Sequence, residues 1–127
     1  MKALLKNYHQ SPRKVRLVAD LIRGKSVEKA KESLLFLMDK SSPIISKLLD
    51  SAVANARDLG VNTESLFVKK ITVDKGLVMR RSRPFARGRS GSVRKTMSIV
   101  YLELGMGAGT AKKSKPMHVK KVAAATK

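Results

Sequence analysis

The sequence predicts an α+β fold, in which three helices pack on a small three-stranded antiparallel sheet with a long protruding β-hairpin arm. Two patterns predict this class: residues 12–60 repeat apolar side chains at helical spacing, and the chain then shifts to β-branched and aromatic residues. Charge predicts the arm, because residues 80–95 carry no acid and their basic side chains cannot be buried on a domain. A chain of 127 residues has room for one domain.

The first two elements are a strand over residues 2–8 and a helix over residues 12–23. Ala3, Leu4, Leu5 and Tyr8 suit a strand. In Ser11-Pro12 the serine hydroxyl is placed to cap the helix and the proline takes its first position, while Gly24 ends it. The apolar residues at helical spacing are Val15, Val18, Leu21 and Ile22.

The next two elements are also helices. Ser26 is placed to cap a helix that ends near Asp39, and its apolar face is predicted to consist of Val27, Ala30, Leu34, Leu37 and Met38. Ser42-Pro43 repeats the serine and proline pattern, and a long helix then continues to Gly60. The small side chains of residues 52–56 in this helix allow another element to approach closely.

Residues 66–73 and 96–102 are predicted as two strands of a long antiparallel hairpin. Strands of about ten residues extend about 33 Å, so the hairpin outreaches a domain of this size. We therefore expect a single domain over residues 1–104 that includes an arm over about residues 75–95, ordered by a partner or else mobile. Residues 105–127 are predicted to form a flexible glycine segment followed by a basic tail rich in Lys and Ala.

Composition excludes several classes of function. Lys and Arg number 28 against 9 Asp and Glu, and the resulting net charge of +19 indicates a polyanionic partner. The absence of Cys excludes disulfides, thiolate nucleophiles and Cys-bound zinc. The acids are scattered singly and His9 is far from His118 along the chain, so we expect no enzyme, metal or cofactor. No secretory signal or membrane span is expected, which makes a cytosolic location the default.

Two basic clusters are the candidate binding residues. The first, on the predicted arm, consists of Arg80, Arg81, Arg83, Arg87, Arg89, Arg94 and Lys95. The second surrounds the first helix and consists of Arg13, Lys14, Arg16, Arg23 and Lys25. Arginine predominates in the arm, and its planar guanidinium binds phosphate in a bidentate manner. Solvated surface charge is the alternative for both clusters, and it is more serious for the helix.

Two separated basic sites suit a folded RNA better than a straight duplex, which has no interior for an arm to enter. A DNA-bending architectural protein is the main alternative, because basic β-arms with a proline near the tip also describe minor-groove wedge binders. That alternative predicts a dimer in which Pro84 intercalates between base steps. His9 is available to contact phosphate or a base, although its spacing does not require this.

Three segments carry a resemblance to a known family: Ser11-Pro12-Arg13-Lys14-Val15-Arg16-Leu17, Ser51-Ala52-Val53-Ala54-Asn55-Ala56 and Arg83-Pro84-Phe85-Ala86-Arg87-Gly88-Arg89. In this order and spacing they resemble the bacterial form of the universal large-subunit ribosomal protein L twenty-two family. The resemblance extends from about residue 1 to residue 104 and does not include the tail.

The resemblance implies a structural component of the large ribosomal subunit that binds large-subunit ribosomal RNA (rRNA) and aids early assembly. It implies a cytoplasmic protein of the ribosome that is not a homo-oligomer. The globular part is then expected near the opening of the peptide exit tunnel. The hairpin is expected to line the tunnel wall, next to the nascent peptide and to ribosomal protein L four at a constriction.

The resemblance also assigns the tip of the arm. The residues that correspond to the tunnel tip are Ser82, Arg83, Pro84, Phe85, Ala86, Arg87 and Gly88. Changes at this tip are associated with macrolide resistance in the family. The chain departs from the family pattern twice, with Phe85 in place of the usual basic residue and Ser98 in place of a common His. Near Phe85 and Ala86 we expect contact with the tunnel lumen instead of with phosphate.

Overall fold

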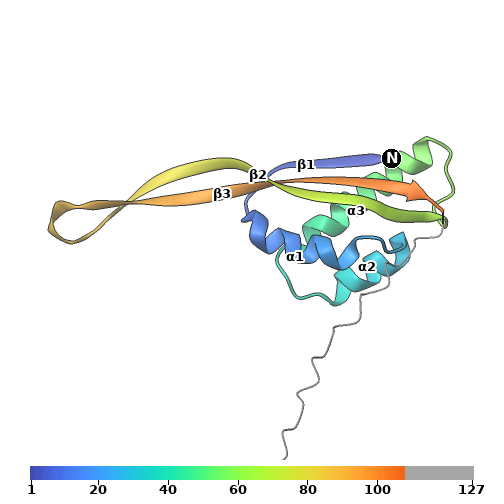
Figure 1. Cartoon of the computed structure of the whole chain (residues 1–127), viewed down its shortest axis with the longest axis horizontal. Helices are drawn as coiled ribbons and strands as arrows, with labels where there is room; N and C mark the ends of the chain where they lie inside the picture. The colour runs from blue at the N-terminus through green and yellow to red at the C-terminus, as the bar shows by residue number, and fades with distance from the viewer. Residues whose placement is uncertain (108–127) are drawn as a thin grey trace, which may run out of the picture.

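A computed structural model describes residues 1–107 and shows two layers, a three-stranded sheet and three helices that cover one of its faces (Figure 1). The elements in chain order are β1 (Lys2–Tyr8), α1 (Pro12–Ile22), α2 (Val27–Phe36), α3 (Ser42–Asp58), β2 (Leu66–Pro84), a short 3₁₀ turn η1 (Ala86–Gly88) and β3 (Ser90–Met106). The predicted α+β class, with its three helices and three antiparallel strands, is confirmed.

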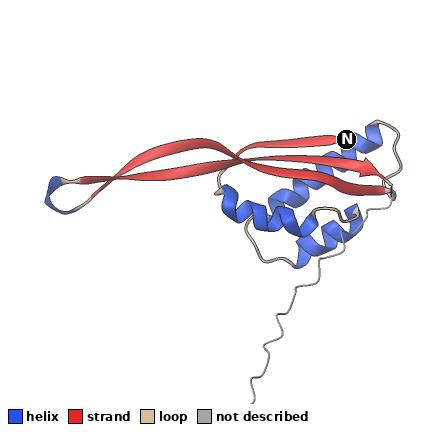
Figure 2. Ribbon diagram, viewed as in Figure 1, coloured by secondary structure: helices blue, strands red, loops and turns tan. Residues whose placement is uncertain are grey.

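The strand order is β1-β3-β2, and both pairings are antiparallel. Leu102 of β3 lies opposite Ala3 on one side and Ile71 on the other, so β3 is the central strand. Residues 90–97 of β3, which precede Ser98, pair only with β2. Here the two strands form a two-stranded ribbon that projects past the helices (Figure 2). The arm is therefore a direct extension of the sheet.

The core lies between the sheet and the helix layer. Alternate residues of the strands are buried against the helices, as the two-residue period of a strand requires, and they include Ile71 and Val73 of β2 and Val100 and Leu102 of β3. On the helix side the buried residues of α1 are Val15, Val18, Ala19 and Ile22. These apolar contacts fix the sheet end of the hairpin, from which the arm projects.

The small residues of α3 pack as the sequence predicts. Ala52 and Ala56 are completely buried and Val53 nearly so, while Asn55 faces away from the core. The Asn55 side-chain amide donates a hydrogen bond of 3.0 Å to the Lys2 carbonyl of β1. Small side chains thus bring α3 close to the first strand, and an amide then holds the two elements together.

The helix boundaries correct the sequence predictions in detail. Helix α1 ends at Ile22 rather than at residue 23, and α2 ends at Phe36 rather than near residue 39. As a result Met38 is fully exposed and does not belong to the apolar face of α2. Helix α3 ends at Asp58, two residues before Gly60, which adopts φ +71° in the turn that follows.

The predicted serine caps occupy the right positions but do not act through their hydroxyls. Ser11 and Ser26 precede α1 and α2, yet neither side chain makes a capping hydrogen bond. In α3 the N-cap is Ser41 instead, and the buried Ser42 hydroxyl donates to the Leu34 carbonyl near the end of α2. A tertiary bond between two helices has therefore replaced the local cap.

The arm begins at a β-bulge in β2. Lys75 pairs with Ser98 and Val78 with Thr96, so two residues of β2, Gly76 and Leu77, oppose one residue of β3. A Cβ at position 76 would lie 3.3 Å from the Met97 carbonyl oxygen. Glycine thus allows the strands to approach closely where the ribbon leaves the sheet.

The strands are longer than the sequence predicted, because cross-strand hydrogen bonds continue through the polar arm where apolar periodicity is absent. At the other end, Gly105 and Met106 pair with Phe67 and Leu66. Strand β3 therefore extends to Met106, two residues into the segment that the sequence analysis assigned to the tail. The remainder of the predicted tail, from residue 108, lies outside the described residues.

Candidate nucleic-acid interface

The basic residues of the arm occupy both faces of the two-stranded ribbon. Residues directly opposite in an antiparallel pair share a face, and the faces alternate along each strand. Arg80 and Arg94 are opposite one another and lie on one face. The other face carries Arg81, Arg83 and Lys95, from the pairs Arg81–Val93, Arg83–Gly91 and Met79–Lys95. A polyanion that meets this arm has basic side chains to contact on either side.

The charges of the arm have no carboxylate partners within residues 1–107. The ion pairs of the described chain all lie in the globular part, as Arg23–Asp20, Lys31–Asp50 and Lys69–Glu103. On the arm, Arg81 donates only to its neighbours, to the Arg80 carbonyl at 3.1 Å and to the Met79 sulfur at 3.7 Å. Like charges directly across a strand pair, as at Arg80 and Arg94, are destabilising by themselves, and an anion bound between them would remove this repulsion.

The tip of the arm is a tight turn. Pro84 pairs with Ser90, and the Phe85 amide donates a hydrogen bond of 2.8 Å to the Arg89 carbonyl. Arg87 and Gly88 both adopt positive φ, at 59° and 68°. A non-glycine residue in this left-handed region is strained. The turn therefore holds the Arg87 side chain, which is exposed, at the extreme end of the arm.

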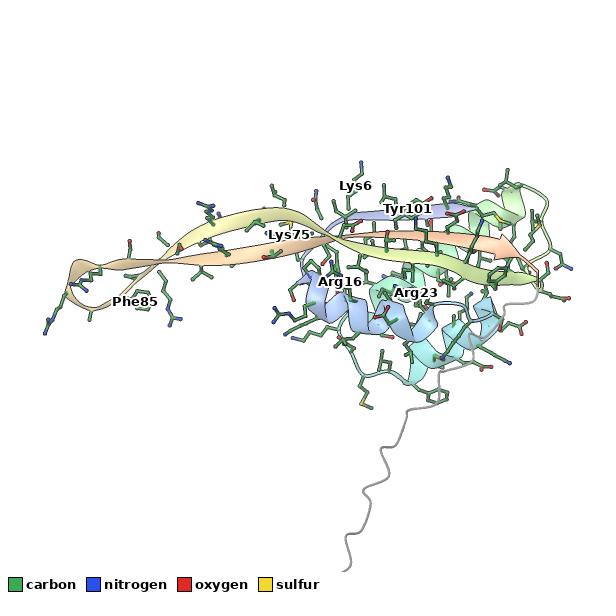
Figure 3. All side chains as sticks on the ribbon, in the orientation of Figure 1. Lys6, Arg16, Arg23, Lys75, Phe85 and Tyr101 are labelled. Carbon is green, nitrogen blue, oxygen red and sulfur yellow. The ribbon has the colours of Figure 1, made fainter. Side chains whose placement is uncertain are left out.

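Phe85 lies at this far end, and its ring packs on the backbone of β3 at Gly91 (Figure 3). A Cβ added to Gly91 would lie 2.9 Å from Phe85 Cδ2 and would overlap with Cε2. The aromatic ring of Phe85 is thus accommodated by a glycine across the ribbon. Its ring remains 59 % exposed, so it covers the end of the strand pair and still presents an apolar surface.

The second basic cluster does not form one uniform surface. The side chains of Arg13 and Lys14 of α1 are exposed and make no hydrogen bond or ion pair with other residues of the described chain, as expected of binding residues. Arg16, in contrast, donates from Nε and Nη2 to the Val73 carbonyl of β2 at 3.1 and 2.9 Å. Figure 3 shows Arg16 on the helix layer beneath the strands. Its guanidinium therefore links α1 to the sheet.

Arg23 and Lys25 also serve the fold. Arg23 donates to the Ile71 carbonyl at 3.2 Å and pairs with Asp20 at 2.8 Å, while Lys25 Nζ donates to the Ser33 hydroxyl at 2.9 Å. The β2 strand is an edge strand, and these arginines occupy carbonyls that no neighbouring strand reaches. Sequence reasoning placed Arg16 and Arg23 among the RNA contacts but did not foresee this structural role, since their partners lie 57 and 48 residues away.

The two basic clusters meet where the arm leaves the domain. An open cavity of about 330 Å³ lies there between the loop before α1, Lys14 and the first residues of the arm, and we call it the junction hollow. The residues that line it are His9, Gln10, Ser11, Lys14, Met79, Lys95, Thr96 and Met97. Lys14 of one cluster and Lys95 of the other thus border the same cavity.

Met79, Thr96 and Met97 are members of this surface that the sequence analysis did not identify. No local pattern distinguishes them, because only the pairing of β2 with β3 brings them beside the loop before α1. Within residues 1–107 the structure contains no group of three or more side chains arranged to hold a metal ion. In the same part of the chain, no helix is long and apolar enough to cross a membrane.

The fold and this surface define a small, basic α+β protein that presents a two-stranded arm. Residues 3–105 match the family model described as Ribosomal protein L22p/L17e. Three relatives bear the name Large ribosomal subunit protein uL22. The Neorickettsia sennetsu protein is 46 % identical over 87 % of this chain and 98 % of its own length. The Acholeplasma laidlawii protein is 47 % identical over 78 % of this chain and 90 % of its own length. The Trichlorobacter lovleyi protein is 50 % identical over 74 % of this chain and 84 % of its own length.

The chain belongs to the ribosomal protein L22p/L17e family. It is a structural, non-enzymatic protein of the large ribosomal subunit and of the cytoplasmic ribosome. The resemblance stated from the sequence is confirmed, as is the expectation that the protein is not an enzyme. The DNA-bending alternative is not supported by this membership.

Proposed function

We propose that the protein binds large-subunit rRNA with a continuous basic surface that runs from the start of α1 to the tip of the arm. The observation that supports this most directly is the presence of basic side chains on both faces of a ribbon that has no acidic residue between positions 75 and 102. A surface that binds one flat partner needs charge on a single face. An arm that is basic on both faces suits a channel between RNA helices, where phosphates surround it.

In this proposal the helix layer and sheet anchor the base of the arm on rRNA near the tunnel opening, and the arm reaches the tunnel wall. The nine residues 76–84 extend about 30 Å from the domain. The exposed ring of Phe85 faces the lumen and the nascent peptide, with ribosomal protein L four nearby. Insertion of the arm between RNA segments also gives the protein a role in early assembly, because the RNA must fold around it.

The test is a competition experiment at moderate salt, with labelled protein and large-subunit rRNA against an excess of transfer RNA or duplex DNA. We expect rRNA to retain the protein while both competitors fail to displace it. Equal competition by all three polymers would reduce the interaction to general polyanion binding and contradict the proposal. A matched pair of variants locates the surface: Arg81→Ala with Arg83→Ala should weaken retention, whereas Glu28→Ala with Glu32→Ala should not.

A further inference from the structure

The junction hollow has the dimensions and the lining of a small-ligand site. Its volume of about 330 Å³ lies at the lower end of the range of such sites, about 300–1,000 Å³. A cavity of this size admits one base with its sugar and phosphate but not a base-paired helix. Unpaired nucleotides that turn out of a folded RNA are the parts of RNA that proteins bind in this manner.

One wall of the hollow is rigid before any ligand arrives. The Gln10 side-chain oxygen accepts hydrogen bonds from the Tyr8 hydroxyl at 2.7 Å and from the Ser41 hydroxyl at 2.8 Å. The Gln10 carbonyl also accepts a bond from the hydroxyl of Ser98, which is fully buried. These three bonds fix the loop that carries His9 and Ser11, so binding there costs little ordering entropy.

The polar groups of the hollow suit an anion. Lys14 and Lys95 reach it from α1 and from β3, and His9 lies on the rigid loop between them. None of the lining residues is acidic. The Ser11 hydroxyl makes no capping hydrogen bond in α1, which leaves it available to donate to a ligand. Two lysines and a serine that line one cavity offer donors of the kind that a phosphate group requires.

The apolar groups suit an aromatic ring. Met97 is 3 % exposed at the base of the hollow and Met79 is half-buried beside it. Methionine sulfur makes favourable contacts with aromatic rings, and its flexible side chain adapts to rings of different size. Apart from the His9 imidazole, no ring of the protein lines the hollow, so the two methionines are open to a ring of the ligand.

We propose that the junction hollow binds one unpaired nucleotide of the RNA, with its base against Met79 and Met97 and its phosphate between Lys14 and Lys95. The proposal rests on the proposed function, since it names one element of the RNA at the root of the arm. In this proposal the base of the arm recognises the shape of the RNA, in addition to the electrostatic attraction that the arm provides. The register of the arm on the RNA is then set at its base rather than at its tip.

The test uses the full-length protein with ¹³C-labelled methionine methyl groups, titrated with adenosine 5′-monophosphate. Ribose 5-phosphate is the matched ligand, because it has the sugar and the phosphate but no base. We expect the nucleotide to move the Met79 and Met97 methyl signals upfield through its ring current, and ribose 5-phosphate to leave them in place. The signals of Met38 and Met106, which lie outside the hollow, serve as internal references.

A charge-matched pair of double variants tests the phosphate contacts. Lys14→Gln with Lys95→Gln should weaken nucleotide binding about tenfold, whereas Lys29→Gln with Lys47→Gln, on α2 and α3, should not change it. All four lysines are exposed, so their substitution should not disturb the core. The methyl signal of the buried Met97 verifies that each variant folds.

Equal effects of the two ligands on the methyl signals, or no effect of either, would overturn the inference. If this happens while rRNA still retains the protein, the inference fails and the proposed function stands. If rRNA does not retain the protein, the proposed function fails whatever the nucleotide does. The two ideas therefore have separate outcomes.

Discussion

The opposed arginines of the arm allow one substitution to separate folding from binding. Arg80 and Arg94 are directly opposite across β2 and β3, and Cβ atoms in such pairs lie about 5 Å apart. We consider Arg94→Glu, which replaces a like-charge pair by an ion pair at the same position. Without RNA the change should stabilise the ribbon, and with RNA it should remove a phosphate contact.

The size of the first effect follows from cross-strand pair energies. Pairs of this kind are worth about 0.2–1 kcal/mol, and the reversal from repulsion to attraction gives about 1 kcal/mol after screening by salt. This corresponds to about fivefold slower hydrogen exchange at the arm amides near the pair. The free protein at low salt is the sample in which to measure it.

The second effect appears in rRNA binding. Loss of one phosphate contact should reduce the slope of log K against log salt concentration by about 1. The affinity at moderate salt should fall by about tenfold, because a carboxylate then faces the RNA. Arg57→Glu on α3 is the control, since it makes the same change of charge at an exposed position outside the arm. Faster exchange in the arm would contradict the predicted ion pair, and an rRNA affinity equal to that of this control would contradict a phosphate contact at Arg94.

Three further substitutions test contacts of the structure. Arg16→Ala should reduce the free energy of unfolding by about 1–2 kcal/mol and lower the thermal midpoint by several degrees, because two hydrogen bonds to the Val73 carbonyl are lost. Arg13→Ala should leave the midpoint unchanged, and calorimetry of both variants measures the difference. Gly91→Ala should displace the Phe85 ring and alter the amide signals of the tip, whereas the same change made in a Phe85→Ala background should alter them much less; an unchanged spectrum of the single variant would contradict the packing. Ala52→Leu should reduce the free energy of unfolding by about 1–3 kcal/mol in urea denaturation, since the site is fully buried against the sheet, and a neutral result would mean that α3 has room to move.

The helices and the basic arm were predictable because their evidence is local. Helical spacing and the prolines at positions 12 and 43 located α1 and α3 within two residues at either end. The arm was predictable for an energetic reason, because an acid-free run of arginines cannot be buried on a small domain. The lengths of β2 and β3 were not predictable from the sequence, because the polar half of each strand lacks an alternation of apolar residues. The extent of that half depends only on its pairing with the other strand.

The candidate site could be predicted only in part. Composition identified Lys14 and Lys95 as basic residues, but not that they border one cavity. Arg16 and Arg23 have the same local appearance as their exposed neighbours, yet they bind carbonyls of β2. The role of each arginine depends on which backbone atoms the fold brings within reach, and no pattern of neighbouring residues records this.

The class of fold, the family and the sign and location of the charge could be predicted from the sequence, because periodicity, motif spacing and composition are properties of neighbouring residues. The tertiary structure was needed to show which basic side chains bind the protein's own backbone, that the arm is basic on both faces, and that Lys14 and Lys95 border the same hollow. These features depend on the pairing register of β2 with β3 and on the packing of α1 against the sheet. Both are long-range interactions, and they become defined only when distant segments of the chain come together.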